Sequence, residues 1–318
     1  MSMDSCTLVA PAKINLYLEI IGDRPDGYHE LVMVMQSIAL ADRIELKSIG
    51  IDTFRVHCSH AGVPTDNNNL AYRAAQLMAQ EFPDAFENLG GAEITIDKQI
   101  PVAAGLAGGS TDAAAVLVGL DLMWNLGLTL PALQELGAKL GSDVPFCIGG
   151  GTALATGRGE KISPLSNLTG TFIVLGKFRS LQVSTPWAYQ TFRREFGHNY
   201  ADDDAGLETR QQRVHSGPMV SAILHQDFRQ IGEKLYNDLE RVVLPAHPQV
   251  AQLREAFRQA GGLGAMMSGS GPTVFAIAES EAQATQIRDA AREAIPDPDL
   301  DLWTTQFATT GIQVISNK

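Results

Sequence analysis

The sequence predicts an α+β fold with two domains, and three observations lead to this prediction. The chain has 318 residues, enough for two domains that each bury a hydrophobic core. Hydrophobic residues make up 45% and charged residues 19%, which is typical of globular proteins. Strand-like and helix-like segments mix without the strict alternation of a doubly wound sheet. We expect an N-terminal domain over residues 1–165 and a C-terminal domain over 166–318.

The first segments predict a hairpin followed by a helix. Apolar runs at 14–20 and 31–38 indicate strands. Between them, the sequence Arg24-Pro25-Asp26-Gly27 predicts a turn, because proline presets φ and glycine tolerates positive φ. A helix is expected near 68–81, where Asn67, Asn68 and Asn69 offer a cap before an apolar stripe.

The middle of the chain combines a strand, a glycine-rich loop and a helix. Residues 93–97 (EITID) alternate as a strand, and residues 101–109 (PVAAGLAGG) form the loop. Residues 110–124 (STDAAAVLVGLDLMW) predict a helix, and a further helix fits 131–140. Strands are expected around 151–156 and 171–175.

The C-terminal half contains a polar stretch and then more regular elements. Residues 197–217 are poor in apolar side chains and predict an exposed, mobile loop or an insertion. Helices follow near 218–237 and 248–259, then a strand at 273–278 and a helix at 280–294. A final strand pair closes the chain.

Charge and cysteine content limit the classes of partner. The net charge of -12 makes non-specific nucleic-acid binding unexpected, because such binding needs a basic surface. Cys6, Cys58 and Cys147 form no CxxC pair, which favours reduced thiols in a cytoplasmic protein. We find no apolar run long enough to span a membrane and no export or transit signal. The expected state is a monomer or weak homodimer without nucleic-acid or membrane partners.

The glycine-rich loop is suited to holding phosphate groups. Gly105, Gly108 and Gly109 let the backbone approach an anion, and the following helix adds the positive end of its dipole. The hydroxyls of Ser110 and Thr111 can reach a phosphate or Mg²⁺. Neither GxxxxGK[ST] nor GxGxxG after a strand occurs, so the loop is neither a P-loop nor a Rossmann fingerprint. A plain turn with Ser110 as helix cap is the alternative.

Four motifs in order resemble the GHMP kinase superfamily. PVAAGLAGGSTDAA is similar to its second motif, and PAKINLYLEIIGDRPDGYHEL resembles the first motif as found in the diphosphocytidyl-methylerythritol kinases. GSDVPF resembles their catalytic-aspartate segment, and MSGSGPTVFAI resembles the third motif. Together the motifs span almost the whole chain. One departure is Ala107, where many relatives have a third consecutive glycine; alanine is small enough for ATP binding but resists positive φ.

The resemblance implies a fold, a reaction and an ATP site. The N-terminal domain would be ribosomal-protein-S5-domain-2-like and the C-terminal domain ferredoxin-like, with ATP and Mg²⁺ between them. The reaction would transfer phosphate to the 2-hydroxyl of 4-diphosphocytidyl-2-C-methyl-D-erythritol, in the non-mevalonate route to isoprenoid precursors. The ATP-binding residues would be Pro101, Val102, Ala103, Ala104, Gly105, Leu106, Ala107, Gly108, Gly109, Ser110, Thr111 and Asp112. Ser110 is the candidate metal ligand, and no acidic ligand can be assigned.

Lys13 and Asp143 are the expected catalytic residues. Asp143 can cap the short turn that starts at Val144 or accept the proton of the attacking hydroxyl, and the resemblance favours the second role. Lys13 lies within an apolar strand, where an unpaired ammonium is costly, so a carboxylate partner such as Asp143 is expected. The alternative for Lys13 is an outward-facing lysine on an edge strand.

The expected substrate-binding residues lie in two segments. Asn15 shares a strand face with Lys13, and Tyr28 and His29 follow the turn, where the resemblance places the cytidine. Thr185 and Pro186 would line the same site. A second aromatic wall would come from Trp187 or Tyr189, and the choice stays open here. The loop Gly269-Ser270-Gly271-Pro272 would close over phosphates or form a simple turn. The asparagines at 67–69 would approach the adenine or only cap the helix.

Three alternative functions agree less well with the sequence. A GHMP kinase for another small alcohol would not need the DGYHE segment, because its substrate has no base to stack on Tyr28. A non-catalytic ligand sensor of the same fold would be expected to lack Lys13 or Asp143, and both are present. A structural α+β protein with glycine turns does not explain four motifs in order.

Overall fold

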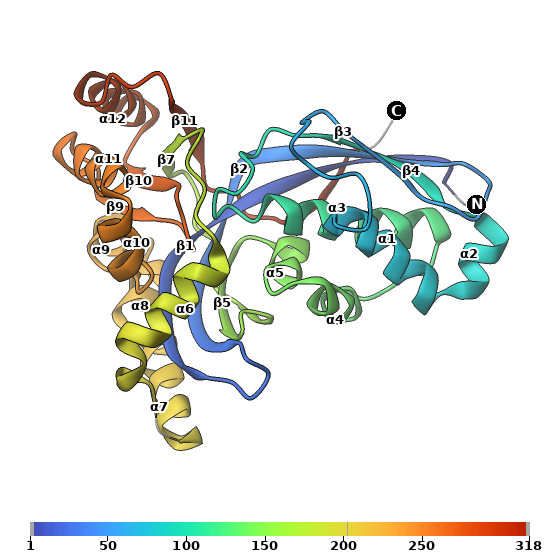
Figure 1. Cartoon of the computed structure of the whole chain (residues 1–318), viewed down its shortest axis with the longest axis horizontal. Helices are drawn as coiled ribbons and strands as arrows, with labels where there is room; N and C mark the ends of the chain where they lie inside the picture. The colour runs from blue at the N-terminus through green and yellow to red at the C-terminus, as the bar shows by residue number, and fades with distance from the viewer. Residues whose placement is uncertain (1–2, 202, 316–318) are drawn as a thin grey trace.

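The computed structural model of the protein describes residues 3–201 and 203–315 and has the predicted α+β architecture. Within these residues, one long β-sheet extends over most of the molecule, and a second, smaller sheet lies beyond it at one end (Figure 1). The long hairpin β1 (Ser5–Asp23) and β2 (His29–Ser48) belongs to the first sheet and passes close to the second. The predicted strands at 14–20 and 31–38 and the turn between them are therefore confirmed.

The first sheet is assembled on this hairpin, with strands paired along both halves of β2. Its main path is β12-β1-β2-β4-β3, while β5 pairs with β2, β6 with β5, and β8 with β1. The parallel pair β3–β4 is connected through helices, and the strand predicted at 93–97 is confirmed as β4. The added strands are β3 (Arg55–Cys58), β4 (Ala92–Asp97), β5 (Thr152–Gly157), β6 (Lys161–Pro164), β8 (Tyr236–Asn237) and β12 (Gln313–Ile315).

Bulges in β1 determine which side chains reach the site. Register shifts occur between Pro11 and Ala12 and again between Asn15 and Tyr17. Leu8 and Ala10 belong to one core cluster, Ala12, Ile14 and Leu16 to the other, and Leu18 and Ile20 to the first again. A bulge inserts one extra residue, so the side chains that follow it point to the opposite face of the sheet from the one they would otherwise occupy. Lys13 and Asn15 lie between the two bulges and flank Ile14, so their side chains point to the face of the sheet opposite to that of Ile14.

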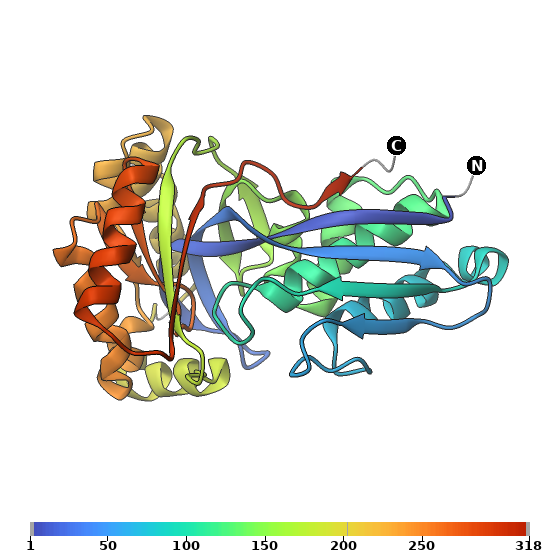
Figure 2. The same cartoon turned by 90° about the horizontal axis from the view of Figure 1, so that it is seen from above.

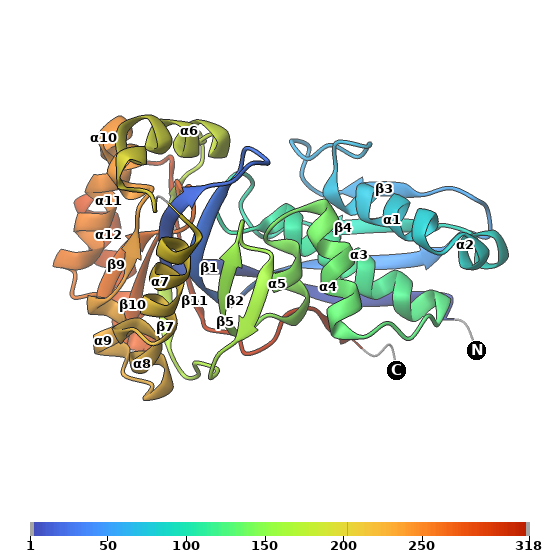
Figure 3. The same cartoon turned by 90° about the horizontal axis from the view of Figure 1, so that it is seen from below.

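Helices of the N-terminal half cover one face of the first sheet (Figure 3). α3 packs against β1, β2 and α1, and its residues are buried on most sides because the other helices enclose it. The side chain of Asn69 caps α1 by accepting a hydrogen bond from the backbone N–H of Ala71 at 2.8 Å. The helices are α1 (Leu70–Glu81), α2 (Pro83–Leu89), α3 (Gly108–Trp124), α4 (Leu130–Leu140) and α5 (Val144–Gly149).

The second sheet has the order β11-β7-β10-β9 and is covered by α11 and α12 (Figure 2). Its strands are β7 (Phe172–Phe178), β9 (Gly264–Met267), β10 (Val274–Ala278) and β11 (Leu300–Gln306). The helices of this half are α6 (Thr185–Phe196), α7 (Asp204–His215), α8 (Pro218–Leu224), α9 (Phe228–Glu233), α10 (Glu240–Ala246), α11 (Pro248–Gln259) and α12 (Glu281–Ala294), with the 3₁₀ turn η1 (Gly197–Asn199). The predicted helices 248–259 and 280–294 are confirmed.

Residues 197–217 were predicted to be an exposed, mobile loop or an insertion, and the loop alternative was wrong for most of the segment, because α7 forms there. The carboxylate of Asp203 accepts a hydrogen bond from the N–H of Gly206 at 2.8 Å and caps the helix. Val214 is buried, and Leu207 lies against Gly22 of β1. Two well-placed apolar side chains thus fix a helix whose other faces are polar, and such a pattern is weak in the sequence.

Two further expectations are corrected, and one stays a prediction. The helix expected near 218–237 is broken into α8 and α9, with Gln226 between them at φ 53°. The final two strands do not pair with each other: β11 joins β7, and β12 returns to β1. The domain boundary near residue 165 stays a prediction. Among the described residues, no helix combines the length and apolar character needed to cross a membrane.

Candidate active site

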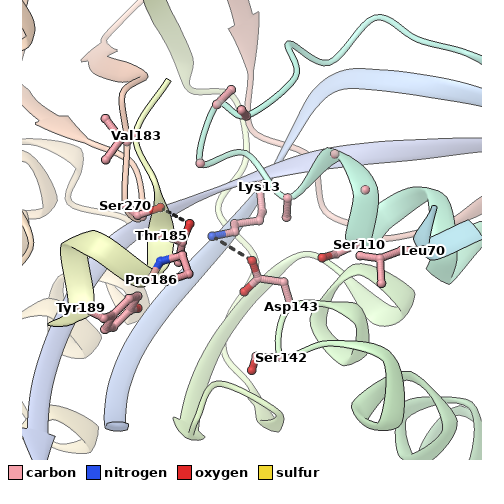
Figure 4. Close-up of a pocket in the computed structure, with 18 of the residues that line it drawn as sticks. Lys13, Leu70, Ser110, Ser142, Asp143, Val183, Thr185, Pro186, Tyr189 and Ser270 are labelled. Atoms are coloured by element: carbon pink, nitrogen blue, oxygen red, sulfur yellow. Dashed lines mark hydrogen bonds and ion pairs between the residues drawn. The ribbon is translucent and has the colours of Figure 1, made fainter. Parts of the chain in front are cut away.

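A cavity of about 740 Å³ lies between the hairpin, the glycine-rich loop, the start of α5, α6 and the loop at 269–271 (Figure 4). Its wall therefore contains parts of both halves of the chain. Most residues that the sequence singled out line it: Lys13, Asn15, Tyr28, His29, Asn68, Asn69, Pro101–Gly105, Ala107–Ser110, Asp112, Asp143, Thr185, Pro186, Tyr189 and Gly269–Gly271. Leu106 and Thr111 are buried and do not line the cavity.

The glycine-rich loop adopts the left-handed conformation at three positions. Ala103 has φ 51°, Gly105 has φ 73° and Ala107 has φ 59°. Ala107 directly precedes α3, which begins at Gly108, two residues before the predicted start. Ala107 thus adopts a conformation that alanine resists. Gly108, Gly109 and Ser110 at the start of α3 line the cavity, and the backbone N–H groups of a helix start suit an anion.

The loop is anchored to both halves of the protein. The backbone N–H of Lys13 donates to the carbonyl of Leu106 at 3.1 Å. The hydroxyl of Ser268 donates to the carbonyl of Gly105 at 3.1 Å. A Cβ on Gly105 would lie 2.3 Å from the carbonyl oxygen of Ser268, so only glycine permits this approach of two backbones.

Lys13 and Asp143 meet at the centre of the cavity, as Figure 4 shows. Their Nζ and Oδ2 atoms are 3.4 Å apart, and Lys13 also donates to the amide oxygen of Asn15 at 2.8 Å. Lys13 is 4% exposed, so it is not an outward-facing edge lysine. Asp143 makes no side-chain capping hydrogen bond to α5, although it occupies the cap position. Its carboxylate is therefore free to face the cavity.

The aromatic side chains gather at the hairpin end of the cavity. His29 is buried, and its ring centroid lies 5.1 Å from that of Tyr189 and 6.1 Å from that of Tyr200. Burial, assisted by Arg193, lowers the pKa of His29 to about 4, although Asp23 acts in the opposite direction. Tyr28 is 53% exposed, with the guanidinium of Arg158 5.2 Å from its ring centroid.

Helix α6 supplies the second aromatic wall through Tyr189. Tyr189, Thr185 and Pro186 line the cavity, whereas Trp187 does not and instead contacts His247 with a centroid distance of 5.8 Å. The hydroxyls of Thr185 and Ser270 are 2.7 Å apart, so α6 is tied to the 269–271 loop (Figure 4). The geometry thus selects Tyr189 from the two aromatic residues that the sequence left open.

Sequence reasoning missed a buried charge cluster beneath the loop. Lys98 Nζ lies 2.5 Å from Asp42 Oδ2 and 2.6 Å from Asp112 Oδ2. Burial raises the pKa of Asp112, with Lys98 opposing and Asp42 reinforcing the rise. Asp42 also accepts backbone N–H bonds from Gln99 and Ile100 at 2.6 and 2.8 Å. The only signal was a lysine between the strand EITID and the loop, which a solvent-exposed strand end explains equally well.

Oxygen donors suited to Mg²⁺ are present, but the described residues contain no group of three or more His, Cys, Asp or Glu side chains able to hold a metal by themselves. Ser110 contributes a hydroxyl and Asp143 a carboxylate to the cavity wall. Mg²⁺ commonly takes few protein ligands and keeps waters and substrate phosphates as the others. The donor set therefore fits a Mg²⁺ that arrives with a nucleotide.

Comparison with known proteins finds relatives among kinases. Residues 69–151 match the GHMP kinases N terminal domain, and residues 219–297 match GHMP kinases C terminal. The 4-diphosphocytidyl-2-C-methyl-D-erythritol kinase of Nostoc punctiforme is 65% identical over 99% of this chain and 100% of its own length. The enzyme of that name from Trichodesmium erythraeum is 62% identical over 98% of this chain and 99% of its own length.

Solved structures have the same fold. The crystal structure of a 4-(cytidine 5'-diphospho)-2C-methyl-D-erythritol kinase has a TM-score of 0.73 and 30% identity, with 95% of this chain and 99% of that chain covered. A homoserine kinase from Cytophaga hutchinsonii also has a TM-score of 0.73, at 19% identity over 98% of both chains, which shows the fold alone.

The glycine-rich loop, the ion pair between the buried Lys13 and the partly exposed Asp143, and the two-domain fold define a small-molecule kinase of the GHMP class, which uses ATP as phosphate donor. Within this class, the identity over nearly the full chain is decisive. The chain belongs to the 4-diphosphocytidyl-2-C-methyl-D-erythritol kinase family.

Proposed function

We propose that this protein transfers the γ-phosphoryl group of ATP to the 2-hydroxyl of 4-diphosphocytidyl-2-C-methyl-D-erythritol, yielding ADP and the 2-phosphate. The relatives that share most of this sequence carry the name of that activity. The observation that carries the chemistry is the Lys13–Asp143 pair at 3.4 Å, facing a cavity that ends in an aromatic pocket. This proposal places the enzyme in the non-mevalonate route to isoprenoid precursors.

Asp143 is the proposed general base. Its carboxylate accepts the proton of the attacking hydroxyl while the hydroxyl oxygen forms a bond to the γ-phosphorus. The bond from the γ-phosphorus to the bridging oxygen breaks, and ADP leaves with that electron pair. Lys13 holds the Asp143 carboxylate and stabilises negative charge on the transferring group. Asn15 fixes the Lys13 ammonium by accepting its hydrogen bond at 2.8 Å.

The remaining cavity residues bind and orient the two substrates in this proposal. The backbone of the loop at 101–109, with the start of α3 and the hydroxyl of Ser110, receives the phosphates of ATP. Mg²⁺, when bound with the nucleotide, neutralises phosphate charge, and Ser110 is its proposed protein ligand. The cytosine lies against Tyr28, His29 and Tyr189, and Thr185 and Pro186 line the path between the base and Lys13.

We also propose that the protein acts in the cytoplasm as a monomer or weak homodimer, without nucleic-acid or membrane partners. The net charge of -12 and the free thiols of Cys6, Cys58 and Cys147 support this proposal. Sedimentation equilibrium across a range of concentrations measures the oligomeric state. A stable tetramer or larger assembly would contradict the proposal.

An ADP-release assay with Mg-ATP tests the function. The wild-type protein should release ADP with the cytidine substrate and not with mevalonate, homoserine or galactose. Asp143→Ala should lose this release, whereas Asp84→Ala, on the exposed surface of α2, should retain it. Release with another alcohol would leave the ATP site intact and refute the cytidine assignment. ATP binding without release for any alcohol would support a ligand sensor instead.

A further inference from the structure

One face of α6 contacts three separate parts of the cavity wall. Thr185, Tyr189 and Arg193 are spaced four residues apart and therefore project from the same side of the helix. Thr185 contacts Ser270, and Tyr189 contacts His29. The third residue of this stripe, Arg193, lines the cavity and reaches the tip of the β1–β2 hairpin.

The guanidinium of Arg193 binds this tip at three acceptors. Its Nε donates to Asp23 Oδ1 at 2.8 Å. Its Nη2 donates to the carbonyl of Gly27 at 3.1 Å and to the carbonyl of Tyr28 at 3.4 Å. The acceptors lie on both sides of the turn, one at the end of β1 and two just before β2. A planar fork can hold all of them together, which an ammonium cannot do with the same geometry.

The turn has few other contacts that would fix its position relative to α6. Arg24 pairs with Asp26 and Glu30 inside the hairpin, and Gly27 has open space around its Cβ position. Tyr28, which follows, is 53% exposed, and the guanidinium of Arg158 lies 5.2 Å from its ring centroid. An exposed turn of this kind is flexible unless another element orders it, and ordering it only on ligand binding weakens affinity.

We propose that Arg193 is a positioning residue that determines specificity for the cytidine group. By holding the turn from Asp23 to Tyr28 against α6, it keeps Tyr28 and His29 beside Tyr189 as one preformed aromatic site. This inference rests on the proposed function and deepens it. The Lys13–Asp143 pair and the glycine-rich loop make no hydrogen bond or ion pair with Arg193 among the described contacts, so the effect of Arg193 is directed to the cytidine substrate and not to ATP.

Steady-state kinetics of Arg193→Ala and Arg193→Lys test this role. Arg193→Ala loses the three hydrogen bonds of the guanidinium at a solvent-exposed turn, where water compensates for part of the loss. The KM for the cytidine substrate should therefore rise by about 5- to 30-fold. The kcat and the KM for ATP should stay within about twofold of wild type, because uniform binding is lost without loss of transition-state contacts. The matched control is Arg194→Ala, the next residue on α6, whose side chain is 69% exposed and, among the residues that the structure describes, pairs only with the neighbouring Glu195.

Asp23→Ala should cause a smaller rise in KM than Arg193→Ala, because the hydrogen bonds from Arg193 to the carbonyls of Gly27 and Tyr28 remain. Asp23→Ala/Arg193→Ala should be little worse than Arg193→Ala, because the ion pair between the two side chains is already lost in that variant. Titration with cytidine 5'-diphosphate, which carries the base and needs no turnover, should show the same loss of affinity. Thermal unfolding midpoints close to wild type would exclude a general folding defect as the cause.

The outcomes separate this inference from the proposed function. An Arg193→Ala variant that behaves like Arg194→Ala, or that weakens ATP as much as the cytidine substrate, overturns the role of Arg193. A wild-type protein that binds cytidine 5'-diphosphate but does not phosphorylate the cytidine substrate refutes the function alone, and the titration still decides the role of Arg193. Absence of cytidine 5'-diphosphate binding by the wild type refutes both.

Discussion

Replacing Gly105 by alanine perturbs the contact between the glycine-rich loop and the loop that follows β9. Gly105 has φ 73°, and its added Cβ would lie 2.3 Å from the carbonyl oxygen of Ser268 and 3.1 Å from the backbone of Gly271. Both neighbours are backbone atoms, so no rotation of a side chain relieves the clash. The two loops must therefore separate in the variant.

The structure gives the expected size of the effect. Separation weakens two hydrogen bonds, from Ser268 Oγ to the carbonyl of Gly105 and from the N–H of Lys13 to the carbonyl of Leu106. If each hydrogen bond contributes roughly 0.5–1.5 kcal/mol, their loss raises the free energy of the native loop conformation by about 1–3 kcal/mol. We expect kcat/KM for ATP to fall by roughly 5- to 150-fold. The strained φ of the alanine adds about 1–2 kcal/mol of destabilisation to folding.

Gly170→Ala separates the clash from the strained backbone. Gly170 has φ 71°, nearly that of Gly105, but its Cβ position has no atom within 4 Å. Both variants should have lower thermal unfolding midpoints by differential scanning calorimetry, and only Gly105→Ala should lose kcat/KM for ATP. Ala107 at φ 59° shows that alanine is accepted in this loop where space allows. If the two variants have equal activity, the contact between the loops does not support ATP binding.

Three further predictions concern charged groups. Asp143→Asn should lower kcat by about 10²- to 10⁴-fold in steady-state assays while the KM for ATP changes little, and a smaller loss would contradict its role as base. Lys98→Met leaves Asp42 and Asp112 buried without their cation and should reduce the free energy of unfolding by about 3–5 kcal/mol; unchanged unfolding would contradict this. Because burial lowers the pKa of His29 to about 4, its neutral form contributes stability that is fully present above its usual pKa of about 6.5 and is lost as pH falls toward 4. The unfolding midpoint of the wild type should drop more than that of His29→Gln across this window, and equal drops would refute the coupling.

The elements that the sequence predicted best are those whose local signals agree with their tertiary surroundings. Asn69 caps α1 as its residue type suggests, and the Pro25-Gly27 segment forms the expected turn. In α7 the polar composition suggested a loop, but the cap at Asp203 and the contact of Leu207 with β1 decide the structure. A contact of this kind joins residues far apart in sequence, so a local pattern cannot reveal it.

The same distinction applies to the site. Lys13, Asn15 and the loop residues were found because motifs mark them, and the geometry chose Tyr189 over Trp187 because only the helix register decides which side faces the cavity. Lys98 and Arg193 carried no motif in the sequence analysis. Their importance follows from partners 14 to 170 residues away, namely Asp112 for Lys98 and Asp23 for Arg193.

The bulges of β1 help to explain why the two halves of the chain supply different residues of the site. In a regular strand, successive side chains point to opposite faces of the sheet. Without bulges in β1, the odd-numbered Lys13 and Asn15 would therefore lie on the face opposite to the even-numbered Leu8. The bulge after Pro11 shifts the alternation by one residue, so that Lys13 points to the same face as Leu8. This face is covered by the helices, and Lys13 meets Asp143 there, at the start of α5. In the proposed mechanism the chemistry thus depends on elements of the N-terminal half, whereas α6 brings Tyr189 and Arg193 from the other half to the aromatic pocket. If Lys13 and Asp143 carry out the proposed chemistry, exchanging residues on α6 should alter which alcohol is accepted and leave phosphoryl transfer itself intact.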